Sequence, residues 1–241
     1  METNPLSSSL PVLTRAGLRL LACVAPDSLS SGSTNALKAL QPLSWTCSRL
    51  ILIGHVGQEL WPSFQRERLS FSDESPLDEY SLHHGQLFLQ AMSAKVQSLA
   101  LYPSEHFFPL TPLLQDVQWS RDSLLGLGIH GKWGLWQAVR AVFLVEADWP
   151  EHWPSVQESP CLKCVETPCV SGCLGAAMTK AGLEIESCLE FRLQENSPCA
   201  LQCSARASCP VGAEHRYSEE QEAFHYGHSL EMIRRWRRGE L

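Results

Sequence analysis

Eight of the ten cysteines in this 241-residue chain lie between positions 161 and 209. Nothing in the sequence points to export, and thiols inside a cell are kept reduced, so clustered cysteines there usually bind metal. We therefore expect this segment to fold around metal that its cysteine thiolates bind. The remaining two, Cys23 and Cys47, stand far away in the sequence and are expected to be plain buried thiols. The eight clustered residues are Cys161, Cys164, Cys169, Cys173, Cys188, Cys199, Cys203 and Cys209.

The spacing of these cysteines favours iron-sulfur ligation. The first four form the pattern CxxCxxxxCxxxC, and the last is followed by Pro210. Eight thiolates are the number that two 4Fe-4S clusters need, and in two-cluster ferredoxins the fourth cysteine of a run ligates the other cluster. We therefore expect two sets of ligands, namely Cys161, Cys164, Cys169 and Cys209 for one cluster, and Cys173, Cys188, Cys199 and Cys203 for the other.

Other uses of eight cysteines stay open. Two zinc sites would also use eight thiolates, although such sites usually contain separated CxxC pairs and this segment has one. Disulfides also fit the count. Both runs depart from the ferredoxin pattern, since four residues separate Cys164 from Cys169 and five separate Cys203 from Cys209. A single cluster with leftover cysteines is therefore a further alternative.

Charge and hydropathy exclude two classes of partner. The formal net charge of −7 gives no excess of Lys and Arg, so nucleic acid is not expected to bind. No run approaches the roughly 18 apolar residues of a membrane span, and we expect a cytoplasmic protein. One local basic cluster, Arg234 to Arg238, could dock a partner protein.

The remaining pattern predicts an α+β fold. Apolar runs predict strands over 50–53, 96–102 and 138–145, and a strand or short helix over 18–24. Ser75 and Ser218 are expected to cap helices that begin beside them. With the prolines near 150 as a boundary, the expected domains are a flexible lead-in (1–14), an α+β domain (15–150), a ferredoxin-like domain (151–215) and a C-terminal helix (216–241).

Three stretches resemble known families. The segment 161–209, which ends in Cys-Pro-Val-Gly-Ala, resembles the dicluster ferredoxin domain of epoxyqueuosine reductase and of corrinoid-dependent reductive dehalogenases. The tracts 129–140 (IHGKWGLWQAVR) and 216–224 (RYSEEQEAF) resemble the CblC family, which removes the upper ligand of cobalamin. These resemblances imply a nitroreductase-like α+β domain, followed by a small iron-sulfur domain and a C-terminal helix.

The first resembling tract also suggests a cofactor pocket that takes cobalamin or flavin. Gly134 would let a ligand approach the backbone, and Trp133 and Trp136 would form flat apolar walls. His130 would be an axial ligand or a proton donor, and Arg140 would bind an anionic group. The alternative is that these tryptophans belong to an ordinary core.

The expected function is an iron-sulfur oxidoreductase or electron-transfer protein that reduces a bound corrinoid. Its electrons would come from a redox partner protein, either a reductase or a flavodoxin-type donor. The CblC family lacks the cysteines, and the ferredoxin-bearing families are longer than this chain, so neither activity transfers directly. If the chain is an enzyme, the resemblance implies a cobalamin-related oxidoreductase. A stand-alone ferredoxin-like carrier and a zinc-stabilised interaction protein are the alternatives.

Overall fold

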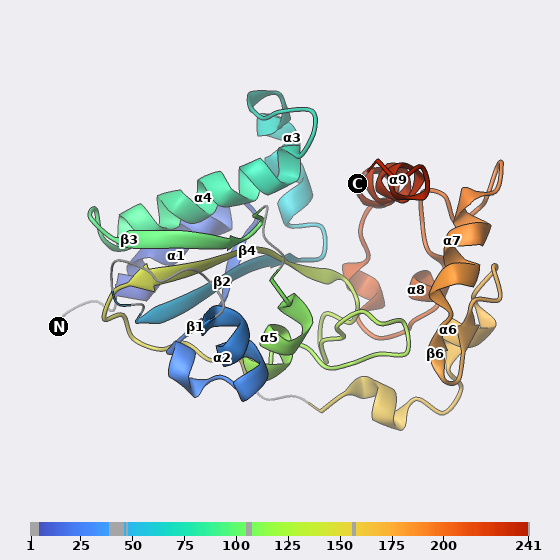
Figure 1. Cartoon of the computed structure of the whole chain (residues 1–241), viewed down its shortest axis with the longest axis horizontal. Coiled ribbons are helices and arrows are strands. Elements are labelled where there is room, and N and C mark those ends of the chain that lie inside the picture. Colours follow the sequence, from blue (N-terminus) through green and yellow to red (C-terminus); the bar gives the residue numbers. More distant parts are fainter. Residues whose placement is uncertain (1–4, 39–45, 47, 105–107, 156–157, 241) are drawn as a thin grey trace. The chain divides into compact units, whose positions relative to one another are not determined.

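The computed structural model describes residues 5–38, 46, 48–104, 108–155 and 158–240. The chain forms two compact units, the first from 1–119 and 137–157 and the second from 120–136 and 158–241 (Figure 1). The domain ranges expected from the sequence stay a prediction. The compact units differ from those ranges in that segment 120–136 groups with the cysteine-rich segment. Cys47 lies outside the described residues.

A four-stranded antiparallel sheet organises the first unit, in the order β1-β2-β4-β3. Strand β2 is buried from Leu50 to Val56, which explains its continuous apolar run. The predicted strands are confirmed, and the ambiguous stretch 18–24 is a strand. Their bounds are β1 Arg19–Val24, β2 Arg49–Val56, β3 Gln97–Tyr102 and β4 Gln137–Glu146.

Helices cover this sheet. In Figure 1, α4 runs along one side of the sheet, and α2 and α5 lie on the other side. A Cβ atom on Gly85 of α4 would lie 2.6 Å from the Phe143 ring of β4, so this glycine permits a close helix-to-strand approach. The helix begins at Pro76 as predicted, but the Ser75 side chain makes no capping hydrogen bond. The helices are α1 Pro5–Arg15, α2 Ser31–Lys38, α3 Leu60–Glu67, α4 Pro76–Met92 and α5 Leu110–Asp116.

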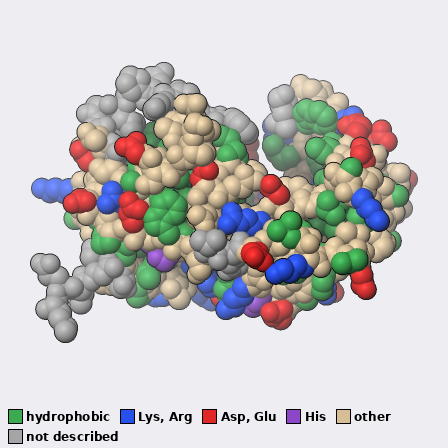
Figure 2. Space-filling view, turned by 90° about the horizontal axis from the view of Figure 1, so that it is seen from below, with side chains coloured by type: hydrophobic (Ala, Val, Ile, Leu, Met, Phe, Trp, Pro, Cys, Tyr) green, Lys and Arg blue, Asp and Glu red, His purple; other side chains and the backbone are tan. Residues whose placement is uncertain are grey.

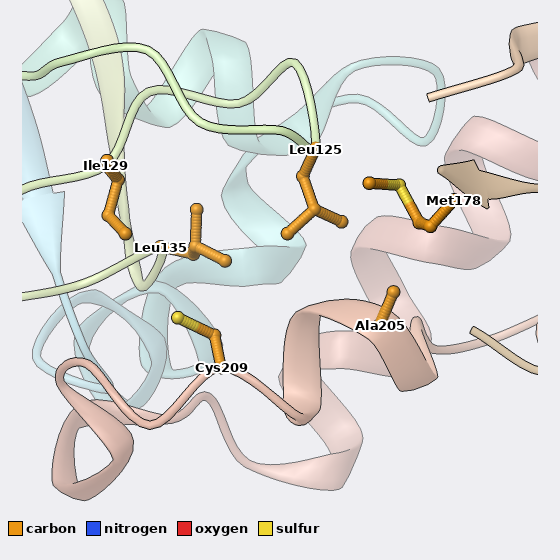
Figure 3. Packing of buried hydrophobic residues seen from close by; sticks show 6 residues of the cluster. All are labelled: Leu125, Ile129, Leu135, Met178, Ala205 and Cys209. Atoms are coloured by element: carbon orange, nitrogen blue, oxygen red, sulfur yellow. The ribbon is translucent and has the colours of Figure 1, made fainter. Parts of the chain in front are cut away.

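Short elements and loops make up most of the second unit. They enclose a small apolar core, drawn in Figure 3, to which segment 120–136 contributes Leu125, Ile129 and Leu135. Met178, Ala205 and Cys209 complete this core from the cysteine-rich segment. The elements are η3 Pro160–Lys163, α6 Pro168–Ser171, β5 Met178–Thr179, β6 Gly182–Leu183, α7 Ile185–Leu193, α8 Ser204–Ala207, η4 Ala213–His215 and α9 Glu219–Arg237.

Helix α9 follows its sequence signals. Ser218 Oγ accepts a hydrogen bond from the Gln221 backbone N–H at 3.2 Å, so the predicted cap is confirmed. Acidic side chains occupy the first turn and arginines the last, which complements the helix dipole. The chain is thus a mixed helix-and-sheet protein, as predicted. Within the described ranges, no helix is both long and apolar enough to cross a bilayer.

Candidate functional site

All eight clustered cysteines lie in the second unit as free thiols. Four of them line one pocket, namely Cys161, Cys164, Cys169 and Cys209. Proline starts the two short elements near the first three: Pro160 begins η3, which contains Cys161 and ends before Cys164, and Pro168 begins α6, which contains Cys169. Proline is favoured at that position because the backbone N–H that it lacks would have no partner in the helix. The two prolines therefore favour helical turns that begin directly before Cys161 and Cys169.

The wall of this first pocket is largely apolar. Leu125, Ile129 and Leu135 contribute to it from segment 120–136, and Val211 from the turn after Cys209. In Figure 3 the Cys209 side chain points toward Leu135. An apolar wall limits the access of water, which is one of the factors that set the reduction potential of a metal site.

The other four cysteines line a second pocket, with a cavity volume of about 210 Å³. Cys188 lies on α7, and Cys173, Cys199 and Cys203 lie on loops before α7 and α8. The fold thus divides the eight cysteines into two groups of four, with Cys173 and Cys209 exchanged between the runs. This is the division that the crossover of the fourth cysteine predicts. Among the described residues, no three His, Cys, Asp or Glu side chains are grouped to hold a single metal ion.

The thiols of each pocket affect one another's ionisation. Burial raises the pKa of Cys169 and of Cys209, and the neighbouring thiolates of the first pocket raise both further. In the second pocket, burial and then repulsion by the neighbouring thiolates raise the pKa of Cys188 and of Cys203. Ionisation of all four thiols of one pocket together would therefore need a compensating positive charge nearby.

Two buried arginines lie close to the second pocket, and sequence reasoning missed both. Arg192 lines the pocket and donates to the Cys199 carbonyl oxygen at 3.3 Å and to the Tyr226 carbonyl oxygen at 3.0 Å. Arg206 follows Cys203 on α8 and donates to the Leu135 carbonyl oxygen at 2.6 Å. Their place within the cysteine segment was the only available signal, because burial of an arginine depends on partners far away in sequence.

The Arg206 side chain is held by aromatic rings. Its guanidinium carbon lies 4.4 Å from the centre of the Trp136 ring and 4.8 Å from that of Tyr217. The negatively polarised faces of these two rings attract the guanidinium cation. The cation is thereby stabilised within a mostly apolar environment.

The structure places four of the five expected cofactor residues in the second unit. Trp136 is fully buried under Arg206, and Gly134 packs against the backbone at Val211. His130 is 6% exposed, and its Nδ1 accepts the backbone N–H of Lys132 at 3.0 Å, which closes a turn. Trp133 is half-buried beside His215, with ring centres 4.6 Å apart. Their role toward a corrinoid or flavin stays a prediction.

The fifth expected residue, Arg140, lies on β4 of the first unit. Its Nε donates to Nδ1 of His55 at 3.1 Å, and His55 is fully buried on β2. Because that nitrogen accepts a hydrogen bond, the imidazole is neutral and carries its proton on Nε2. Arg140 also lowers the pKa of Tyr102, although burial of Tyr102 outweighs this effect and the net shift is upward.

The basic cluster near the C-terminus is largely neutralised by carboxylates. Arg234 and Arg238 both pair with Glu231, at 3.6 and 3.5 Å, and Arg237 pairs with Glu186. Figure 2 shows basic and acidic side chains interspersed over the face that it presents.

The sequence matches no protein-family model and no curated protein. Solved structures do match. A selenomethionine-labelled epoxyqueuosine reductase is 10% identical with a TM-score of 0.55, covering 91% of this chain and 67% of that one. The epoxyqueuosine reductase from Bacillus subtilis is 12% identical with a TM-score of 0.52, covering 89% and 66%. The C. elegans B12-trafficking protein CblC is 13% identical with a TM-score of 0.47, covering 96% of both chains.

At these identities the similarity concerns the fold. The expected fold link to epoxyqueuosine reductase is confirmed by the two reductase structures. This chain spans about two thirds of the length of those reductases.

Proposed function

We propose that this chain is an iron-sulfur electron-transfer protein whose second unit holds two 4Fe-4S clusters. One observation carries the proposal: the eight cysteines of segment 161–209 line two pockets, four in each. A 4Fe-4S cluster takes four thiolates, one for each iron, so each pocket offers a complete set. The fold of epoxyqueuosine reductase, whose ferredoxin domain the segment resembles, supports the same reading.

The residues present fit such clusters chemically. Neither pocket is lined by a carboxylate or an imidazole among the described residues, so the donor sets consist of sulfur. Soft thiolate ligands suit iron-sulfur clusters and zinc better than they suit hard cations. Each thiolate of a four-iron cluster binds a different iron, so the four sulfurs surround a volume rather than a point. Thiols that line a pocket match this requirement.

The chain's own residues would set the properties of the bound clusters. The apolar side chains Leu125, Ile129 and Leu135 limit water at the first pocket. At the second pocket, Arg192 adds a positive charge close to the sulfurs. Clusters held in this way supply electrons one at a time. A reductase or flavodoxin-type protein would be the donor.

We propose further that a bound corrinoid or flavin accepts the electrons. It rests on the resemblance of tracts 129–140 and 216–224 to the CblC family. Of the five residues assigned to this cofactor, Trp133 and Arg140 are the two that are not buried. The burial of Trp136 under Arg206 instead favours a second candidate, a ferredoxin-like carrier that passes electrons to a partner enzyme.

Anaerobic preparation of the full chain tests the iron-sulfur proposal. We expect a brown protein with about eight irons and eight inorganic sulfides per chain, because two four-iron clusters are bound. Replacing Cys164→Ser removes a ligand of the first pocket and Cys188→Ser one of the second. Each change is expected to lower the iron content or alter the spectrum of one cluster. Cys23→Ser is the matched control, because Cys23 is buried in the first unit.

The outcomes separate the candidates. A colourless protein with about two zincs and no redox signal would support the zinc-stabilised alternative and overturn the proposal. Titration with cobalamin and with flavin, followed by absorbance, tests the acceptor. Binding of either supports the oxidoreductase, whereas a loaded protein that binds neither is expected for the carrier.

A further inference from the structure

The two cysteine pockets differ in the charge of their walls. Within the described residues, the lining of the first pocket contains no Lys, Arg, His, Asp or Glu. The described lining of the second pocket contains one charged side chain, that of Arg192. Two clusters with the same four-thiolate ligation would therefore lie in unequal electrostatic environments.

The position of Arg192 on α7 brings its side chain to the cysteines. Cys188 stands four residues earlier on the same helix, so both side chains lie on one face of α7, and both line the second pocket. The Arg192 Nε donates to the Cys199 carbonyl oxygen at 3.3 Å, which ties the guanidinium to the backbone of another cysteine of this pocket. The cation is thus fixed at the wall that carries two of the four thiols.

The Arg192 guanidinium is buried among neutral hydrogen-bond acceptors. The residue is 9% exposed. Besides the Cys199 carbonyl, its acceptors are the Tyr226 carbonyl oxygen at 3.0 Å and Ser229 Oγ at 3.1 Å, and no Asp or Glu among the described residues pairs with it. Burial of a cation is costly unless an anion lies close to it. The second pocket is the open space beside this cation where such an anion would fit.

We infer, on the basis of the proposed function, that Arg192 is the counter-cation of the second cluster and raises its reduction potential. A four-iron cluster with four thiolate ligands gains negative charge when it is reduced. A cation in the pocket wall stabilises the reduced state more than the oxidised state, whereas the described wall of the first pocket offers no such charge. Electron transfer from the first cluster to the second is thereby favoured.

Potentiometric titration of the loaded full chain, followed by electron paramagnetic resonance, tests the inference. The signal of the second cluster is identified as the one that Cys188→Ser alters. In Arg192→Gln we expect its midpoint potential to fall by about 59 mV, the one-electron equivalent of a tenfold change in the equilibrium for reduction. The midpoint of the first cluster should stay unchanged. Arg192→Lys keeps the cation, so its second midpoint should lie closer to the wild-type value.

Arg237→Gln is the matched control, because it removes a guanidinium from the same pair of helices. Arg237 lies on α9, pairs with Glu186 of α7 and lines neither cysteine pocket. Neither midpoint should move in this control, since water and salt screen a charge at the surface.

Iron content covers the case in which Arg192→Gln does not hold the second cluster. Loss of about four of the eight irons in Arg192→Gln, with full loading of Arg192→Lys, also supports a counter-cation. The same loss in both variants overturns the inference, because hydrogen bonds rather than charge would then maintain the pocket. Unchanged midpoints in a fully loaded Arg192→Gln, equal shifts of both clusters, or an equal shift in Arg237→Gln overturn it and leave the proposed function standing. A wild-type chain that binds no iron-sulfur cluster overturns the inference and the proposed function together.

Discussion

Gly134 and Gly126 in the second unit share a backbone conformation but differ in their surroundings. Both have positive φ, +57° and +70°. A Cβ on Gly134 would lie 1.9 Å from the Val211 carbonyl oxygen, whereas nothing lies within 4 Å of one on Gly126. Close backbone packing against Val211 in the second unit is therefore sufficient to require glycine at position 134.

We expect Gly134→Ala to destabilise the second unit by about 2–5 kcal/mol, the sum of left-handed strain and overpacking. Gly126→Ala should cost only the strain, about 1–2 kcal/mol. Urea denaturation monitored by tryptophan fluorescence measures both. Equal losses in the two variants would contradict the close contact at Val211.

His84 makes the stability of the first unit depend on pH. Burial lowers its pKa below the ordinary value near 6.5, and the hydrogen bond to Glu67 Oε2 at 3.0 Å opposes this shift without reversing it. As the pH falls through 6.5, the unfolded chain takes up a proton that the folded unit resists. Stability is therefore present above the unfolded pKa and lost below it.

We expect the free energy of unfolding to fall between pH 7 and pH 5, and to fall less in His84→Gln. Urea titrations at a series of pH values measure this slope. His152, whose pKa burial also lowers, provides a second contribution that the variant retains. A slope identical to that of the wild type would show that His84 has the same pKa in the folded and the unfolded chain.

At the scale of the elements, the two predicted helix caps behave differently. Ser218 Oγ accepts the Gln221 N–H at the start of α9, whereas the Ser75 side chain makes no such bond at the start of α4. Proline at Pro76 and acids in the first turn of α4 still mark the helix start. The position of a helix start is therefore encoded by several local signals, of which the cap is one.

Ser218→Ala is expected to cost about 1 kcal/mol, the usual value of an N-cap hydrogen bond. Ser75→Ala should cost less than about 0.5 kcal/mol, as for a surface substitution without a specific contact. The midpoints of thermal unfolding by circular dichroism compare the two. A larger effect at Ser75 would contradict this assignment of the caps.

At the scale of the whole molecule, the two compact units depend on different interactions. The first has a sheet between helices, whereas the second has a small apolar core around its thiols. Cys23 reports on the first unit, since it is fully buried on β1 and burial raises its pKa to about 12. A thiol in this state reacts poorly with alkylating reagents.

If the second unit holds clusters as proposed, removal of iron by a chelator is expected to expose the cysteines of segment 161–209 to iodoacetamide while Cys23 stays unlabelled. Without metal, such a unit would lose the binding energy that cluster ligation contributes to folding. Mass spectrometry after brief alkylation locates the labelled residues. Labelling of Cys23 at the same rate would show that both units depend on the metal.

The sequence alone determined the local features of this protein. Apolar runs located the strands, and the signals around Ser75 and Ser218 located two helix starts, because these patterns depend on neighbouring residues. The order of the cysteines also predicted the two groups that line the two pockets, because in two-cluster ferredoxins the fourth cysteine of a run ligates the other cluster. It left the bound species open, because iron-sulfur clusters and zinc use the same thiolates.

Only the tertiary structure decided where distant residues meet. It placed segment 120–136 in the second unit, so that Trp136 lies under Arg206 and His130 closes a turn. It also brought Tyr226 of α9 into the lining of the pocket that Cys203 lines. Such contacts depend on how an apolar core closes over many residues, and no local pattern of residues encodes that closure.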